Sequence, residues 1–124
     1  MKKYNKCIGN YGEDLACSFL KNLGYTILDR NFRTRYGEID IICSYKDIII
    51  FLEIKSRYTN NYGLPIESVT YSKQKQIIKL SKSYIHLKNL YNFNIRYDII
   101  SIIFSNKDNS YKLSHLCDAF RIYL

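Results

Sequence analysis

The chain has 124 residues and a mass of 14.8 kDa, with 47% hydrophobic and 24% charged residues. These proportions predict one folded domain over residues 1–124 and exclude a disordered chain. The longest apolar run, 48–52, is too short for a transmembrane helix, and no apolar segment of a secretory signal follows the basic N-terminus. We therefore expect a cytoplasmic protein without membrane attachment.

The formal net charge is +8, from 19 Lys and Arg against 11 Asp and Glu. An excess of positive charge favours polyanionic partners, nucleic acid before an anionic membrane. The chain is also rich in Ile, Lys, Asn and Tyr, a bias expected from A/T-rich codons. A lysine surface that is only solvated is therefore the alternative interpretation of the charge.

The cysteines and histidines are too sparse for a structural zinc site, because no C-x-x-C pair occurs. Without an export signal, the cysteines are expected to be free thiols in a reducing compartment. They are Cys7, Cys17, Cys43 and Cys117.

The predicted elements begin with a helix that Asn10 can cap and Gly24 can end, because Leu15, Phe19, Leu20 and Leu23 recur at helical spacing. Strands are predicted over 25–33, 38–45 and 48–57, with turns at 34–37 and 46–47. A loop at 58–65 contains the single proline. A second helix begins near Tyr71, with Ile77, Leu80, Tyr84, Leu87 and Tyr91 on its apolar face, and a last strand covers 95–104 before a short terminal segment. Strands separated by a helical crossover predict an α/β fold, a mixed sheet flanked by helices.

The chemically informative segments are Gly37–Asp40 and Glu53–Lys55. Alternation of side chains places Glu38 and Asp40 on one face, and Glu53 and Lys55 on one face. A hairpin around 46–47 then sets Asp40 opposite Glu53 and Glu38 opposite Lys55. Directly opposed like charges destabilise a sheet, and a hard cation such as Mg²⁺ resolves that conflict by taking carboxylate ligands.

Such a site suits phosphodiester hydrolysis. A metal held by Asp40 and Glu53 can polarise the phosphate and acidify a water. Lys55 can orient that water or neutralise developing charge, and the sequence leaves these two roles open. The alternative is an ordinary wet strand face on which Glu38 and Lys55 form a surface ion pair.

Glu13 is a third carboxylate of interest. On the predicted helix it lies in the first turn, at the border of the buried face, from which it can reach a metal at the sheet. The alternative is a capping box, since Glu13 follows Asn10 by three residues and a carboxylate is favoured at a helix N-terminus.

Several blocks of the sequence are specific in combination. They are Gly12–Ala16, Gly24–Leu28, Asn31–Arg33, Gly37–Asp40 and Glu53–Arg57, with Lys73, Arg96–Asp98 and Ala119–Phe120. In this order and over essentially the whole chain, they resemble the YraN family of bacterial proteins. That family resembles the PD-(D/E)XK nuclease superfamily and, within it, archaeal Holliday-junction resolvases. The resemblance implies a restriction-endonuclease-like αβββαβ core.

Carried over by position, the resemblance makes Asp40 and Glu53 ligands of Mg²⁺ or Mn²⁺ and Lys55 the catalytic lysine. Glu13 becomes the helix carboxylate that completes the site. The residue before Asp40 is Ile39 where the superfamily name has proline, a departure that its looser versions allow.

The function implied is a divalent-metal-dependent endonuclease that hydrolyses DNA, including structured DNA of repair or recombination. Arg33, Arg35 and Arg57 near the strand ends can grip phosphates, and Lys73 with the lysines after it can line a DNA channel. Surface charge alone is the alternative for these residues. The rival functions are a non-catalytic nucleic-acid-binding accessory protein and a partner protein that uses its basic face. Related resolvases act as dimers on symmetric junctions, so a homodimer is also considered.

Overall fold

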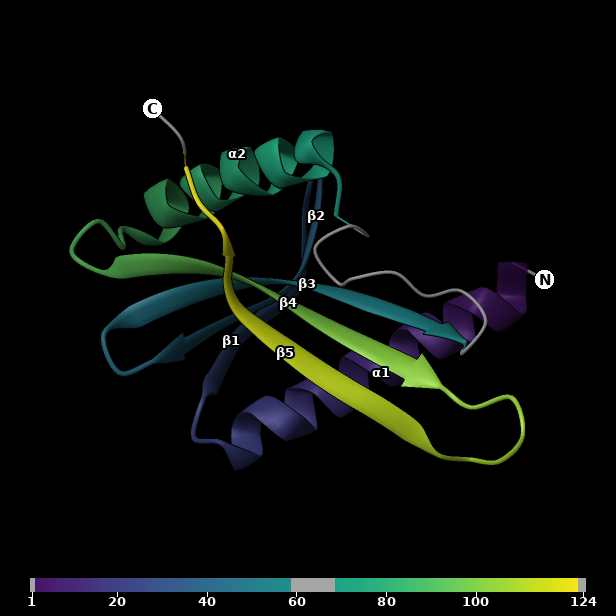
Figure 1. The fold of residues 1–124 in the computed structure, drawn as a ribbon. Helices are drawn as coiled ribbons and strands as arrows, with labels where there is room; N and C mark the ends of the chain where they lie inside the picture. The colour runs from purple at the N-terminus through teal and green to yellow at the C-terminus, as the bar shows by residue number, and fades with distance from the viewer. Residues whose placement is uncertain (1, 59–68, 123–124) are drawn as a thin grey trace.

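The structure is a computed structural model that describes residues 2–58 and 69–122. The predicted α/β fold with an αβββαβ core is confirmed, and one further strand follows it (Figure 1). Most of the predicted loop at 58–65, including Pro65, lies outside the described residues. The elements are α1 (Lys2–Asn22), β1 (Thr26–Thr34), β2 (Gly37–Tyr45), β3 (Ile48–Tyr58), α2 (Tyr71–Lys88), β4 (Asn94–Phe104) and β5 (Tyr111–Phe120).

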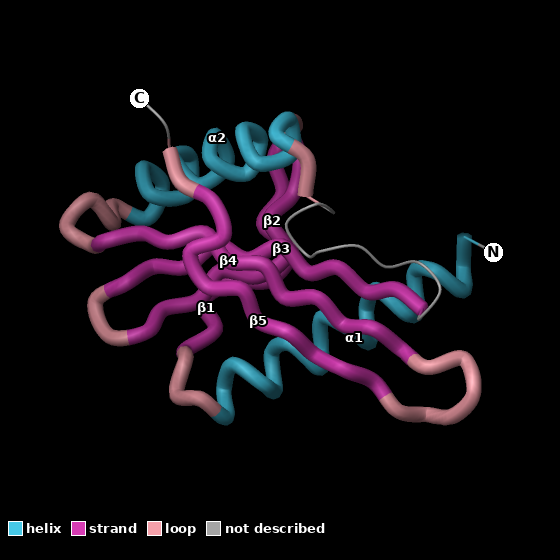
Figure 2. The backbone as a smooth tube through the Cα atoms, viewed as in Figure 1, coloured by secondary structure: helices cyan, strands magenta, loops and turns pink. Residues whose placement is uncertain are grey.

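The strands form one five-stranded sheet in the order β1-β2-β3-β4-β5. β3 and β4 run parallel, whereas the other neighbours are antiparallel. A parallel pair needs a crossover connection, and the segment that contains α2 provides it. Figures 1 and 2 show α2 over one face of the sheet and α1 over the other, so the sheet is the middle of three layers.

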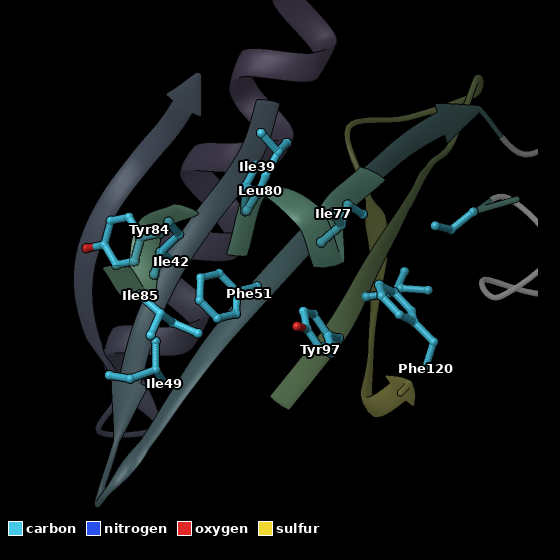
Figure 3. Packing of buried hydrophobic residues seen from close by; sticks show 12 residues of the cluster. Ile39, Ile42, Ile49, Phe51, Ile77, Leu80, Tyr84, Ile85, Tyr97 and Phe120 are labelled. Atoms are coloured by element: carbon cyan, nitrogen blue, oxygen red, sulfur yellow. The ribbon is translucent and has the colours of Figure 1, made fainter. Parts of the chain in front are cut away.

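The core on the α2 side is built from residues three or four apart on the helix. Ile77, Leu80 and Tyr84 of α2 pack into one buried cluster with Ile39 and Phe51 of the sheet (Figure 3). This spacing places one helical face on the sheet, as the sequence predicts. Leu87, also predicted on that face, is 67% exposed, because the helix ends at Lys88, just beyond it.

The core on the α1 side contains Ala16, Cys17 and Leu20 of the helix. One helical turn earlier, α1 lies so close to β3 that a Cβ atom at Gly12 would stand 1.9 Å from Ser56 Oγ. Glycine at this position therefore brings the backbone of α1 against the sheet and sets the height of the next residue, Glu13.

The start of α1 corrects one prediction. The helix begins at Lys2, so Asn10 lies inside it rather than at its N-terminus. The residues before Asn10 include no proline, and only Gly9 among them is a poor helix former, so the helix extends past the predicted cap. The capping-box interpretation of Glu13 is wrong for the same reason. Gly24, with φ +93°, follows the helix as predicted.

The terminal segment corrects another prediction, because it forms the ten-residue strand β5 rather than a short tail. β5 pairs antiparallel with β4 and is an edge strand. An edge strand has a neighbouring strand on one side only and buries few of its side chains. Its sequence can therefore be largely polar and show little hydrophobic alternation. Cys17, Cys43 and Cys117 are free thiols, as predicted.

Candidate functional site

The β2–β3 hairpin has the predicted register until it reaches the acidic residues. Ile41 pairs with Leu52 in the last step of the ladder. Beyond it, the Ile54 backbone N–H donates to Asp40 Oδ2 at 2.8 Å. The carboxyl groups of Asp40 and Glu53 lie close enough to share a proton. The two predicted neighbours are thus in contact through their side chains, at the point where the strands separate.

The side chain of Glu53 is buried and lies near the ammonium groups of two lysines. Its side chain is 7% exposed, and the Nζ atoms of Lys55 and Lys73 lie 4.0 Å from Oε1 and 3.9 Å from Oε2, respectively. Both distances exceed those of a hydrogen bond. Within residues 2–58 and 69–122, no donor is hydrogen-bonded to the buried Glu53 Oε2. This oxygen therefore keeps its full capacity to accept a ligand.

A second acidic group adjoins Asp40. One oxygen each from Glu13, Glu38 and Asp40 lie within 4.8 Å of one another. With its nitrogen turned toward them, the Asn31 amide donates to Glu13 Oε1 at 3.0 Å and to Glu38 Oε1 at 3.1 Å. The structure therefore brings the helix carboxylate Glu13 to Asp40, through the approach of α1 to the sheet.

Glu38 and Asn31 join this site although neither was predicted to be a site residue. Glu38 was expected opposite Lys55, but its partner is Arg33, whose Nε donates to Glu38 Oε2 at 2.9 Å. The reason is that β2 pairs with β1 here, where Arg33 and Glu38 face one another, after its pairing with β3 has ended. The shared strand face of Glu38 and Asp40 was the signal for Glu38.

The electrostatics of the cluster favour protons or cations. Burial and the neighbouring Asp40 raise the pKa of Glu53 to about 8. Burial, with Asp40 again the second cause, raises the pKa of Glu13 to about 7. Burial also raises the pKa of Asp40, although the hydrogen bond from Ile54 opposes this change. Full ionisation of these carboxyl groups at neutral pH is therefore unfavourable unless a bound cation neutralises part of the charge.

The predicted phosphate-binding residues lie in three places. Arg33 and Arg35 are exposed near the turn between β1 and β2, where Arg35 Nη2 donates to the hydroxyl of Tyr36 at 2.7 Å. Arg57 lies partly buried on β3. Lys73 belongs to the acidic site itself, because it approaches Glu53 from α2.

Another polar cluster, on β4 and β5, lies outside this site. The fully buried Asp98 accepts hydrogen bonds from Arg96 at 2.9 and 2.8 Å, and His115 Nε2 lies 2.8 Å from Asp98 Oδ2. Asp98 and Arg96, two residues apart on β4, therefore form an ion pair. Although Asp98, His115 and Cys117 are close enough to share a metal ion, the guanidinium group already supplies the cation that Asp98 needs.

The chain matches the model of "Uncharacterised protein family UPF0102" over residues 12–102. The chain belongs to this family, which confirms the predicted YraN-family resemblance. A UPF0102 protein of Clostridium perfringens is 55% identical over 122 residues, 98% of this chain and 100% of the relative. UPF0102 proteins of Clostridium botulinum and Clostridium acetobutylicum are 53% and 48% identical, over 98% of this chain and 99% and 100% of their own lengths. In the described part of the chain, neither helix is long and apolar enough to cross a membrane.

Proposed function

We propose that this UPF0102 protein is a divalent-metal-dependent endonuclease that hydrolyses phosphodiester bonds of DNA, including structured DNA. The observation that carries the proposal is the buried Glu53 carboxyl in contact with Asp40, with one oxygen not hydrogen-bonded by the described residues and two lysines about 4 Å away. Burial of two acids side by side costs stability, so a sheet selected only for stability would not keep them.

The donors in this site fit a hard divalent cation. Asp40 and Glu53 would hold Mg²⁺ or Mn²⁺, with Glu13 as the third carboxylate, because these ions prefer oxygen ligands. The hydrogen bond from Ile54 fixes the orientation of Asp40, which is the task of an outer-shell partner. When bound, such an ion supplies positive charge to a phosphate and lowers the pKa of a water.

The remaining groups supply charge and position. Lys55 is 36% exposed beside Glu53, so its ammonium group can meet the negative charge that develops on a phosphate. Lys73 offers a second ammonium group from α2. Arg33, Arg35 and Arg57 bind flanking phosphates, which suits the net charge of +8. Free thiols and a DNA substrate agree with a cytoplasmic location.

The test is cleavage of branched, single-stranded and duplex DNA by the purified chain with Mg²⁺ or Mn²⁺. We expect Asp40→Asn, Glu53→Gln and Lys55→Ala each to reduce the cleavage rate by roughly a hundredfold or more while DNA binding is kept. Matched controls are Asp47→Asn and Lys46→Ala in the exposed turn of the same hairpin. They should change the rate less than twofold.

Salt-sensitive binding without cleavage would contradict the nuclease proposal and favour the non-catalytic accessory protein. An absence of DNA binding would contradict both and leave the protein-partner hypothesis. Sedimentation of the same preparation, with and without a four-way junction, tests the proposed homodimer, which would place two sites on one symmetric substrate.

A further inference from the structure

The turn between β1 and β2 is held firmly against α2. The side-chain amide of Gln76 donates to the backbone oxygen of Tyr36. Lys79 places its Nζ 3.9 Å from the centre of the Tyr36 ring. The next residue, Gly37, has φ +140°, and a Cβ atom there would stand 2.6 Å from Gln76. A left-handed glycine thus lets the turn approach the helix closely.

The ring of Tyr36 is oriented by these contacts and yet remains accessible. Arg35 lies 4.9 Å from the ring centre and donates to the Tyr36 hydroxyl at 2.7 Å. Tyr36 nevertheless keeps 42% of its surface exposed. Cations are attracted to the face of an aromatic ring. A tyrosine with cationic neighbours is also typical of nucleic-acid binding, because the ring can stack on a base and the cations can contact the anionic phosphates.

The same helix connects this turn to the acidic site. α2 contacts Tyr36 through Gln76 and Lys79, and it brings Lys73 to Glu53. Tyr36 precedes Asp40 by four residues, so their Cα atoms are at most about 13 Å apart. One strand of B-form DNA advances about 3.4 Å per nucleotide, so this separation corresponds to at most about four nucleotides.

We infer that Tyr36 stacks on an unpaired base near the cleaved bond, which makes DNA with a junction between single strand and duplex the preferred substrate class. This inference rests on the proposed function. An aromatic face accepts any base, so it selects for an exposed base rather than for a sequence. Arg35 and Lys79 contact the phosphates on either side of that base. A duplex keeps its bases stacked on each other and offers none to the ring.

The test measures whether the contributions of the Tyr36 ring and of one DNA base to the binding affinity depend on each other. The full chain carries Asp40→Asn to prevent cleavage, and the probe is a fluorescent duplex with a short single-stranded arm, on either the 5′ or the 3′ side. An abasic site is moved along the arm. We expect Tyr36→Ala to weaken binding about tenfold, one abasic position to weaken it equally, and the two changes together to cost no more than either alone.

Two further variants serve as controls for this test. Tyr36→Phe keeps the ring and should bind within about twofold of the parent, and it remains informative if Tyr36→Ala fails to fold. Tyr91→Ala removes another exposed tyrosine, 64% exposed after the end of α2, and should leave the effect of the abasic site intact.

The outcomes separate the inference from the proposed function. If the effects of Tyr36→Ala and of every abasic position simply multiply, the stacking inference is overturned, whereas cleavage by the wild-type chain still supports the nuclease. If the two effects are coupled but the wild-type chain cuts no DNA, base stacking is supported and the nuclease proposal fails. If the chain binds none of the probes, both are overturned.

Discussion

The backbone N–H of Ile54 donates to the side chain of Asp40, at 2.8 Å, where an undisturbed hairpin would continue its ladder. An aspartate carboxylate thereby replaces a backbone carbonyl as the acceptor. The exchange separates β2 from β3 and keeps Asp40 beside Glu53. One hydrogen bond therefore serves both to end the pairing and to orient a candidate ligand.

The raised pKa values predict an unusual pH dependence of stability in the absence of divalent metal. The ordinary glutamate value is 4.5, whereas Glu53 titrates at about 8 and Glu13 at about 7 in the folded protein. At pH values above 4.5 and below these raised pKa values, the two glutamates hold protons in the folded chain that they have released in the unfolded chain. The free energy of unfolding should therefore fall as the pH rises from about 5 to about 8, by on the order of 6 kcal/mol, because each pKa unit corresponds to about 1.4 kcal/mol.

Urea denaturation with EDTA at a series of pH values measures this slope. Glu53→Gln should remove most of it, because the amide does not titrate, whereas Asp47→Asn in the exposed turn should keep it. A free energy of unfolding that stays level or rises over this interval would show that the acids are not strained in the folded state.

Divalent metal should stabilise the protein mainly above neutral pH. Protons and metal compete for the same carboxylates, so Mn²⁺ or Mg²⁺ binds more tightly once Glu53 and Glu13 have lost their protons. At millimolar metal we expect the melting temperature to rise by about 4 °C or more at pH 8 and by much less at pH 5.5. Differential scanning fluorimetry with EDTA reversal checks this, and equal shifts at both pH values, or in Glu53→Gln, would contradict it.

Gly12 is predicted to control the position of the acidic helix. In Gly12→Ala the new Cβ would meet Ser56, so α1 must move away from β3 and carry Glu13 with it. We expect a loss of about 1–3 kcal/mol of stability and weaker metal binding.

Ser56→Ala provides the matched test for Gly12→Ala. It removes a buried hydroxyl that is not hydrogen-bonded to any described group, so by itself it should be neutral or slightly stabilising. Combined with Gly12→Ala it should restore part of the lost stability. Additive effects of the two changes in denaturation would argue against the close contact.

Asp98 should be essential for stability and separate from the metal site. Burial alone would raise its pKa, but hydrogen bonds from His115, Arg96 and the Asp118 backbone outweigh burial and lower it. Asp98→Ala leaves the Arg96 guanidinium, itself 20% exposed, without its carboxylate. We expect a loss of about 3–5 kcal/mol, measured by denaturation, against less than about 0.5 kcal/mol for the exposed Asp108→Asn. A normal stability of Asp98→Ala would show that the cluster is not structural.

The element order and the β2–β3 register were predictable because their signals are local. The two-residue period of a strand and the turn at 46–47 fix which residues face each other, and Ile41 does pair with Leu52. The helix start was not predictable from Asn10, because a favourable cap does not end a helix that has no breaker before it. β5 escaped prediction because an edge strand is largely polar and buries few side chains, so its hydrophobic alternation is weak.

The sequence by itself determined the fold class, the hairpin and the proximity of Asp40 to Glu53, since each follows from periodicities and turns within a few dozen residues. Only the tertiary structure decided that Glu13 and Asn31 meet Glu38, that Lys73 approaches Glu53, and that Tyr36 rests on α2. These contacts join segments distant in the chain. They depend on how closely each helix packs on the sheet, which is set by the combined shape of many side chains and by close approaches such as that of Gly12 to Ser56.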